Sequence, residues 1–462
     1  MNLKSQKSFL AEFLFLSVLA SFFLLFNLGA GSLASWDEAI YAGVAKDIVR
    51  SGDWFRLTLG GEAWSDKPPL AIWATAFFYK IFGINEFSSR LFSALCGIGA
   101  VLVTYLLGEK LFNRWTGFLG ALVLLSSSHY IRFARFGMMD APLTFFLSLS
   151  LYFFWRGRER NRYLIFSGIA IGLAVMTKGF AAFLVFPIVW IYCVWARESH
   201  ILTRSSYWIG VMIAVGIALP WNLYELTTQG DLFMNDVVGR HLFARTTMAL
   251  DGHAGNAYFY IRTLVNKYHP WILVGIISAP FFLFKAAKDR FEEFVFVTVW
   301  MFFILIVITL VKTKLPWHVL PIYPALSLTV GYVLGRFIKE NQKNMVQIIF
   351  VLIMALHVPY SHIFDHDYSR TIKGIAGTVR QKTENSQTLY LYSFHESPAA
   401  FFYTGRRIAY LDDQNSFLAV AKAEKPFAML IQENNLKSIQ GKLPGLGISV
   451  AGSFEDLVLL KK

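Results

Sequence analysis

Charged residues are scarce in this sequence. Only 16% of its 462 residues are charged, whereas 55% are hydrophobic and 17% are aromatic. Soluble domains carry about 25% charged residues, so the composition excludes an ordinary soluble protein and indicates a polytopic membrane protein. The net charge of +13 would suit a nucleic-acid binder. Lys and Arg also accumulate in the cytoplasmic loops of membrane proteins, and we therefore expect no nucleic-acid partner.

Cysteine is nearly absent. The two cysteines, Cys96 and Cys193, lie inside apolar runs, which excludes a disulfide framework and a cysteine metal cluster. A small-residue cleavage site is also lacking after the first apolar run, residues 9–28, which follows Lys4 and Lys7. We expect an uncleaved first span with its N-terminus in the cytoplasm.

Long apolar runs are plentiful, and a membrane span needs about 20 such residues. The sequence predicts eleven spans, at residues 9–28, 88–107, 115–131, 142–156, 163–177, 179–195, 207–226, 270–285, 293–311, 316–336 and 345–362. Lys or Arg occurs in every loop that this count places inside. The fold expected for residues 1–362 is therefore an α-helical transmembrane domain. Two further segments, 39–51 and 70–82, are too short to span and are expected to lie at the membrane surface or to re-enter it.

The last hundred residues differ in composition. Short apolar strands are expected at 388–392, 408–411, 427–431 and 457–460, with helices at 369–383 and 414–424. This alternation predicts a small α/β domain over residues 363–462. An odd number of spans places that domain outside the cytoplasm. It has no glycine-rich phosphate loop, so we interpret it as a cap and not as a second enzyme.

Acidic residues cluster just after the first span. Asp37 and Glu38 are adjacent, and the same loop later carries Asp66-Lys67-Pro68-Pro69. Acids at the bilayer boundary cost free energy and usually mark a site or a water-filled cavity. The alternative for Asp37 and Glu38 is that they only begin the next helix. The alternative for Lys67 is a pair with Asp66 or an ammonium that reaches lipid headgroups.

Several other outer loops carry charge, against the usual bias. Asp140 precedes Pro142 at a helix start, Lys178 lies in a tight turn, and Lys314 lies in a short basic turn. The stretch 238–245 is basic. Three of these have a simpler alternative: a helix cap for Asp140, snorkelling for Lys178, and a solvated helix for 238–245.

Together, these charges suit one chemistry. Cations can hold a lipid-linked phosphate as it becomes a leaving group, while a carboxylate takes a proton from the acceptor or orients it. A lipid or sugar flippase or transporter is the alternative. That class tends to place charges within interrupted spans and to show repeated halves, and we find no internal repeat. A membrane scaffold is a third hypothesis, but it would not need these acids and cations together.

The ordered motifs resemble the GT-C glycosyltransferases. The stretches that carry the resemblance are Trp36-Asp37-Glu38…Tyr41, Asp66-Lys67-Pro68-Pro69-Leu70, Arg135…Asp140, Thr177-Lys178-Gly179, Gly239-Arg240-His241-Leu242 and Lys314-Leu315-Pro316…Pro324-Ala325-Leu326. Within that fold the sequence is most similar to the lipid A aminoarabinose transferases (the ArnT-like group) and to protein O-mannosyltransferases. The resemblance covers about residues 30–330. The chain looks shorter than the aminoarabinose transferases, which leaves the acceptor open.

The resemblance implies inverting transfer of a sugar from polyprenyl (undecaprenyl) phosphate to lipid A, another glycolipid or glycan, or protein. It implies a bacterial inner-membrane location with the active site on the periplasmic face. The catalytic residues it implies are Asp37, Glu38 and Asp140. The substrate-binding residues are Tyr41, Lys67, Lys178, Arg240, Arg245, Lys314 and His318. Some relatives bind a divalent metal (Zn, Mg or Mn), here through Asp66 and His241. Relatives more often have Glu at the first of these positions and often have Tyr in place of His318.

Overall fold

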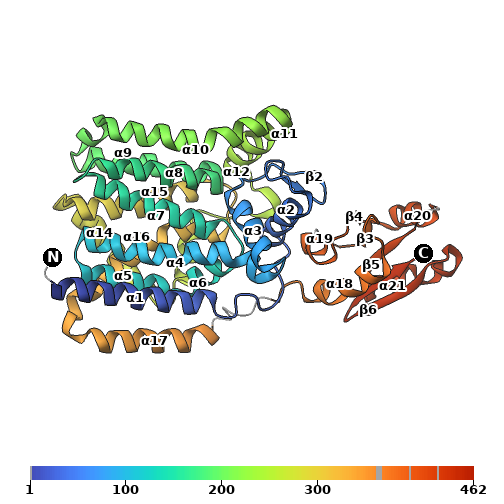
Figure 1. The fold of residues 1–462 in the computed structure, drawn as a ribbon. Helices are drawn as coiled ribbons and strands as arrows, with labels where there is room; N and C mark the ends of the chain where they lie inside the picture. The colour runs from blue at the N-terminus through green and yellow to red at the C-terminus, as the bar shows by residue number, and fades with distance from the viewer. Residues whose placement is uncertain (1–2, 361–366, 395–396, 424–425) are drawn as a thin grey trace. The chain divides into compact units, whose positions relative to one another are not determined.

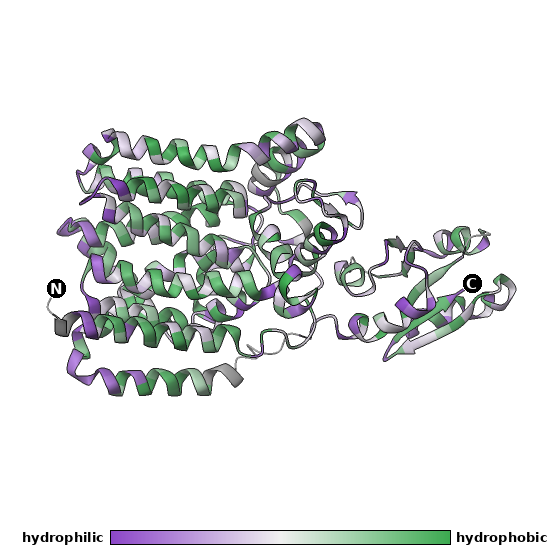
Figure 2. Ribbon diagram, viewed as in Figure 1, coloured by the Kyte–Doolittle hydropathy of each residue, from purple (hydrophilic) through white to green (hydrophobic). Residues whose placement is uncertain are grey.

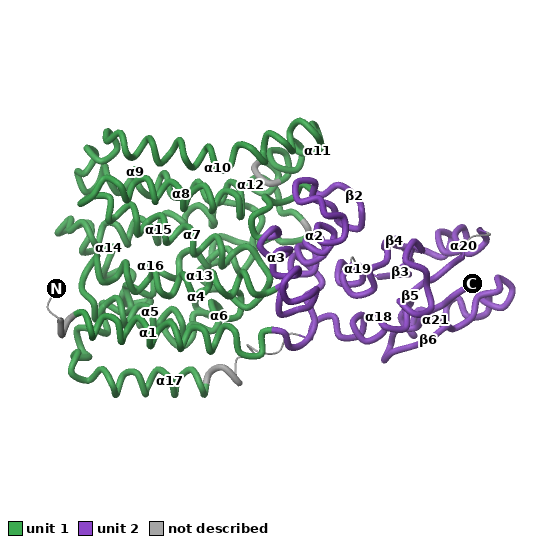
Figure 3. Tube along the Cα trace, in the orientation of Figure 1, with its two compact units in different colours: residues 1–28, 65–71, 90–364 green, residues 29–64, 72–89, 365–462 purple. Residues whose placement is uncertain are grey.

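The computed structural model describes residues 3–360, 367–394, 397–423 and 426–462. The chain forms two compact units, shown in Figure 3. The first contains residues 1–28, 65–71 and 90–364, and the second contains residues 29–64, 72–89 and 365–462. The domain boundary expected between residues 362 and 363 falls in a part of the chain outside the described residues and stays a prediction.

The first unit is a bundle of helices. Its longer helices are α1 (Leu3–Leu25), α4 (Glu86–Leu111), α5 (Arg114–Leu125), α6 (Ser128–Arg135), α7 (Asp140–Gly157), α8 (Arg162–Lys178), α9 (Val185–Trp195), α10 (Ser205–Gln229), α14 (Ile272–Lys288), α15 (Glu292–Leu310), α16 (Tyr323–Phe337) and α17 (Lys343–Tyr360). Apart from α6, which meets α7 at a bend of 110°, they lie roughly along one direction in Figure 1, and Figure 2 shows most of them apolar along most of their length with hydrophilic ends. The expected helical transmembrane fold is confirmed.

Six helical segments in the described part of the chain are long and apolar enough to cross a membrane. They are Gln6–Leu25, Glu86–Leu111, Arg162–Trp195, Ser205–Gln229, Glu292–Leu310 and Pro316–Phe337. A seventh arises if α6 and α7, which meet at a bend of 110°, count as one broken span. The chain is thus a multi-pass membrane protein, and the number eleven stays a prediction.

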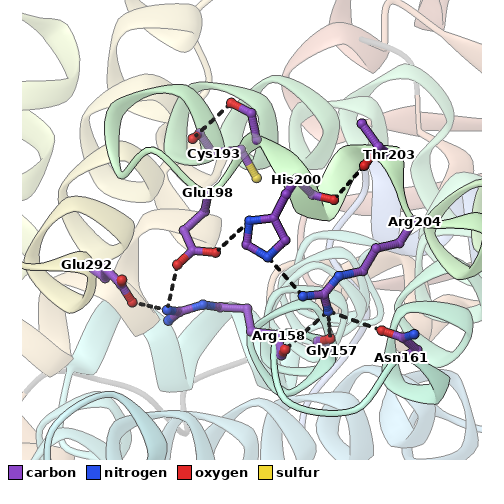
Figure 4. Close-up of polar contacts among 10 residues, drawn as sticks. Gly157, Arg158, Asn161, Cys193, Glu198, His200, Thr203, Arg204 and Glu292 are labelled. Carbon is purple, nitrogen blue, oxygen red and sulfur yellow. Dashed lines mark hydrogen bonds and ion pairs between the residues drawn. The ribbon is translucent and has the colours of Figure 1, made fainter.

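The segment Arg162–Trp195 contains two passes that run in opposite directions. Helix α8 ends at Lys178, the following Gly179 has a φ of +55° that suits glycine, and a 3₁₀ turn leads into α9. Arg158, just before α8, forms an ion pair with Glu198, just after α9, at 3.4 Å (Figure 4). The start of α8 and the end of α9 therefore lie together, which supports the separate spans expected at 163–177 and 179–195.

Glycines allow α8 and α10 to pack closely. A Cβ at Gly168 would lie 2.0 Å from the carbonyl oxygen of Gly210, and Gly172 lies against Ala214 and Ile217. Residue numbers rise together along both helices, so α8 and α10 run in the same direction. Extending this register by six residues from Gly172 brings the end of α8 to the level of residues 221–222 of α10.

The second unit combines helices with a mixed sheet. It contains α2 (Asp37–Ser51), β1 (Thr58–Leu59), β2 (Glu62–Ala63), α3 (Leu70–Phe82), α18 (Arg370–Lys382), β3 (Leu389–Tyr392), α19 (Pro398–Thr404), β4 (Ile408–Leu411), α20 (Gln414–Lys422), β5 (Ala428–Gln432), α21 (Glu433–Ile439), β6 (Ser449–Phe454) and β7 (Leu457–Lys461). The sheet order is β4-β3-β5-β7-β6, in which β3 pairs in parallel with β4 and β5, and β7 pairs antiparallel with β5 and β6. The four strands expected from the sequence are present. Strand β6 was not expected, because Gly452 and a bulge after Val450 interrupt its apolar pattern.

Helix α2 of the early loop packs on α19 of the C-terminal region. Lys46 on α2 is buried, its ammonium donates to the carbonyl of Phe402, and it lies 5.8 Å from the ring centre of Phe401. The amide of Leu33 donates to the Tyr403 hydroxyl at 2.7 Å. The expected surface helices 39–51 and 70–82 therefore correspond to α2 and α3 and belong to the same unit as the sheet.

Candidate functional site

An apolar cavity of about 640 Å³ lies within the first unit. Its walls come from α8, α10 and α15. The apolar lining residues of these helices are Ile171, Val175, Val211, Ala214, Val215, Ala218, Leu219, Ile304, Val307 and Ile308. On α10 the lining positions recur every three or four residues, which is one face of a helix. This face runs from residue 211 to 222, about 16 Å at 1.5 Å per residue. A hydrocarbon chain could lie along it.

One end of this cavity is charged. Lys67, Lys178 and Arg245 line it together with Asp66 and Asp140. Three cations therefore meet two carboxylates beside an apolar passage. Opposite charges arranged in this way suit a ligand with an anionic head and an apolar tail. All five residues were expected to belong to the site, and the structure brings them to one cavity.

The two acids each have a lysine partner. The ammonium of Lys178 lies 2.5 Å from the carboxylate of Asp140, and the side chains are 13% and 3% exposed. The ammonium of Lys67 lies 2.6 Å from the carboxylate of Asp66, so the pair considered as the simpler alternative is present. Lys67 nevertheless lines the cavity, with its side chain only 8% exposed. Asp140 also begins α7, where the positive end of the helix dipole favours a carboxylate.

Arg245 follows a π-helical stretch, Asn235–Ala244, at the start of the short helix α12 (Arg245–Thr247). Its Nε atom is buried and has no hydrogen-bond partner among the described residues. A buried guanidinium nitrogen without a partner costs free energy unless a ligand satisfies it. Arg240, in the same stretch, is exposed and does not line the cavity. Of the two arginines, Arg245 is thus the one that faces the cavity.

His318 completes the lining, and its Nδ1 lies 3.2 Å from the hydroxyl of Tyr260 on α13 (Phe259–Lys267). Burial, together with the charge of Asp140, raises the pKa of Tyr260 to about 12, so the phenol keeps its proton. Lys314 does not line the cavity. Its ammonium donates to the carbonyls of Ile308 and Thr309, which end α15, so Lys314 caps that helix. Its expected role in substrate binding stays a prediction.

Asp37, Glu38 and Tyr41 belong to the second unit. Glu38 is fully buried and accepts a hydrogen bond from the amide of Ala34 at 2.8 Å, which closes the turn before α2. Asp37 is half-buried at the start of α2, and its carboxylate forms no hydrogen bond or ion pair within the described parts of the chain. Tyr41 packs against Trp64 with ring centres 6.1 Å apart. Of these three, Asp37 is the one available for chemistry.

The expected divalent metal stays a prediction. No group of three or more His, Cys, Asp or Glu side chains gathers within the described residues. The Asp66 carboxylate, a proposed ligand, already faces the Lys67 ammonium, whose charge repels a metal ion. The side chain of His241, the other proposed ligand, lies outside the described residues. We therefore assign no step of the reaction to a metal.

The cavity also contains residues that the sequence did not single out. Trp221 and Asn222 line it from α10, and Ser65 donates to Asp236 at 2.5 Å, which joins the early loop to the π-helical stretch. Polar groups within a predicted span were the available signal for the first two. Nothing in the sequence would have paired Ser65 with Asp236.

Comparison with known proteins agrees with this geometry. Residues 66–224 match the family model of the dolichyl-phosphate-mannose-protein mannosyltransferases. The chain is 29% identical over 354 residues to the undecaprenyl phosphate-α-4-amino-4-deoxy-L-arabinose arabinosyl transferase 2 of Pseudomonas fluorescens. Its structure resembles the crystal structure of ArnT from Cupriavidus metallidurans bound to undecaprenyl phosphate, with a TM-score of 0.82, 19% identity and 97% of each chain covered. The chain therefore has the fold of ArnT, and its sequence is similar to the arabinosyl transferases.

The sequence alignments cover a larger share of this chain than of its relatives. The alignment with the P. fluorescens enzyme covers 74% of this chain and 59% of that protein. An alignment with the corresponding transferase of Pseudomonas savastanoi, 28% identical, covers 73% of this chain and 64% of that protein. The chain therefore spans less than two thirds of these curated relatives. The GT-C fold extends further, to the oligosaccharyltransferase of Archaeoglobus fulgidus, with a TM-score of 0.64, 12% identity, and 92% and 70% of the two chains covered.

Proposed function

We propose that this ArnT-like protein transfers a sugar, with inversion, from undecaprenyl phosphate or a similar polyprenyl phosphate to a lipid, glycan or protein acceptor. The observation that carries the proposal is the cavity, which joins an apolar passage along α10 to a cluster of three cations. A polyprenyl chain fits the first part and its phosphate fits the second. The names of the arabinosyl transferases and the undecaprenyl phosphate bound to the Cupriavidus ArnT support the same donor class.

In the proposed mechanism, Lys67, Lys178 and Arg245 bind the donor phosphate. The negative charge on this phosphate grows as the bond to the sugar breaks, so cations held in place stabilise the transition state more than the ground state. Asp140 keeps the Lys178 ammonium in place through their 2.5 Å contact. His318 lines the cavity beside them, and its contact with the Tyr260 hydroxyl keeps its ring in place. Of the remaining expected binding residues, Arg240 and Lys314 line no part of this cavity and would act outside the phosphate site.

The acceptor needs a base or an orienting group, and we propose Asp37 for this role. If the acceptor is an alcohol, a carboxylate base contributes about 10²–10⁴-fold to the rate. If the acceptor is a phosphate, it is already ionised, and Asp37 would mainly orient it. Glu38 supports Asp37 by fixing the turn at Ala34. The inverting outcome follows if the acceptor attacks the anomeric carbon on the face opposite the departing phosphate.

We further propose that the charged end of the cavity faces the periplasm. Lys178 and Arg245 lie in loops that the positive-inside pattern places outside, whereas Arg158 and Arg204 lie in loops that it places inside (Figure 4). Orientation of the C-terminal region on the same periplasmic side follows from an odd number of spans.

The proposal is tested by mass spectrometry of lipid A and surface glycans from cells with the protein, without it, and with Asp37→Asn. We expect a sugar-sized mass increment that requires the wild-type protein and is lost in the variant. A flippase would instead leave the glycosyl bond intact. Identical envelope spectra in all three strains, with the protein expressed, would contradict the proposed transferase.

A further inference from the structure

Helix α10 carries a buried acid that the phosphate site does not use. Glu225 is fully buried within a helix that otherwise reads as an apolar span. One carboxylate oxygen accepts from the side-chain amide of Gln229, and the other, Oε1, is buried without a hydrogen-bond partner among the described residues. No ion pair of Glu225 occurs in this part of the chain either. A buried carboxylate is costly unless a donor or a cation satisfies it.

Two neighbouring polar groups on α10 are also buried without a hydrogen-bond partner among the described residues. They are the indole nitrogen of Trp221 and the side-chain oxygen of Gln229. Trp221, Glu225 and Gln229 are spaced by four residues, so the three groups form one stripe on the helix. The stripe offers one N–H donor and two oxygen acceptors, a combination that matches a ligand rich in hydroxyl or amino groups.

Trp221 of this stripe lines the cavity, and Glu225 and Gln229 follow the lined part of α10 along the helix. Residues 211, 214, 215, 218, 219, 221 and 222 of α10 line the cavity. Glu225 and Gln229 follow residue 222 at spacings of three and seven, which keeps them on the same helix face. They lie about 4.5 Å and 10 Å further along the axis at 1.5 Å per residue.

The apolar, cationic and polar groups follow one another in a fixed order along α10. The apolar lining comes first, and the register of α8 with α10 places Lys178 at the level of residues 221–222. The order along the groove is therefore apolar passage, cations, then the polar stripe. In a polyprenyl-phosphate sugar the order is hydrocarbon, phosphate, then sugar. The stripe thus lies where the sugar of a bound donor would lie, an inference that rests on the proposed function.

We propose that Glu225, with Trp221 and Gln229, forms the subsite for the donor's sugar and accepts a hydrogen bond from an amino or hydroxyl group on it. The Oε1 atom of Glu225 then accepts from the ligand the hydrogen bond that no described residue donates to it. Discrimination follows because a site built around a buried polar group rejects a sugar that leaves this group unpaired.

The test measures binding to the full-length protein in lipid nanodiscs. The probes are undecaprenyl phosphate, the same lipid carrying 4-amino-4-deoxy-L-arabinose, and the same lipid carrying arabinose. The variants are Glu225→Gln, Glu225→Leu and Trp221→Phe. Glu198→Gln, in the cluster of Figure 4, is the matched control for loss of a carboxylate elsewhere.

We expect Glu225→Leu to bind undecaprenyl phosphate like wild type but to bind a sugar-bearing lipid about 10- to 100-fold more weakly. A loss confined to the amino sugar, and shared by Glu225→Gln, identifies an ammonium as the partner. A loss on both sugars with Glu225→Leu identifies a hydroxyl. Trp221→Phe should weaken the same sugar-bearing probes, and Glu198→Gln should weaken none.

Wild-type affinity for both sugar-bearing lipids in Glu225→Leu would overturn the subsite. An equal loss for undecaprenyl phosphate itself would also overturn it, because Glu225 would then only support the fold of the groove. Failure of the wild-type protein to bind undecaprenyl phosphate would instead contradict the proposed function, so the two failures are distinguishable.

Discussion

Replacing Arg245 by Ala tests the phosphate site against a control from the same loop. Arg245 lines the cavity, and its buried Nε atom has no hydrogen-bond partner among the described residues. Arg240 is exposed. A hydrogen bond to a charged group contributes about 1.5–3 kcal/mol. At about 1.4 kcal/mol per tenfold change, Arg245→Ala should weaken the binding of undecaprenyl phosphate by about 10- to 100-fold. Arg240→Ala should change it by less than about threefold, because exposed charges are screened.

The assay is a titration of undecaprenyl phosphate into purified protein in nanodiscs, followed by native mass spectrometry. Arg245→Lys should recover part of the affinity, since it keeps the charge but loses the fork of N–H donors. Removing a phosphate contact should also slow turnover, because the charge on the leaving group increases during transfer. Equal affinities for wild type and Arg245→Ala, or equal losses for Arg245→Ala and Arg240→Ala, would refute the assignment.

Three further predictions follow from the same structure. Asp37→Asn should lower turnover by about 10²–10⁴-fold for an alcohol acceptor while undecaprenyl phosphate still binds, and a purified variant with normal turnover would remove Asp37 from catalysis. A cysteine at exposed Ser386, in a background without Cys96 and Cys193, should react with a membrane-impermeant thiol reagent in cells with a permeabilised outer membrane, whereas labelling only after lysis would invert the orientation. Burial, with nearby Arg50 and Arg380, lowers the pKa of Lys46 to about 7. Between pH 7 and about 10 the unfolded state therefore binds more protons than the folded state, and thermal stability should rise with pH in that range. Lys46→Met should flatten that pH dependence, and an unchanged slope would show that Lys46 is not its source.

The sequence was sufficient for the broad fold because apolar runs and alternating strands are local patterns. The expected pairing of acids and cations in one region also emerged, since Lys67, Asp140, Lys178 and Arg245 line one cavity. Local patterns could not separate Arg245 from Arg240, because the path of the backbone through and after the π-helical stretch decides which one lines the cavity. Nor could they show that the Lys314 ammonium caps α15, since a helix cap and a ligand contact need the same charge.

The position of Glu225 in the groove could not be predicted from the sequence either. Glu225 lies in the apolar run 207–226, which predicts a span, and an acid within a span is itself a signal of function. Only the packing of α8 on α10 shows that Glu225 follows the cation level along the groove.

The central claim is that the donor's sugar leaves a polyprenyl phosphate held in this cavity. The most direct measurement is the release of free undecaprenyl phosphate when purified protein is incubated with undecaprenyl phosphate-4-amino-4-deoxy-L-arabinose and total envelope lipids as acceptor. The account predicts release that requires both donor and acceptor lipids, persists in Arg240→Ala, and is lost in Arg245→Ala and Asp37→Asn. Bound but unconsumed donor, with no undecaprenyl phosphate released by the wild-type protein, would contradict it.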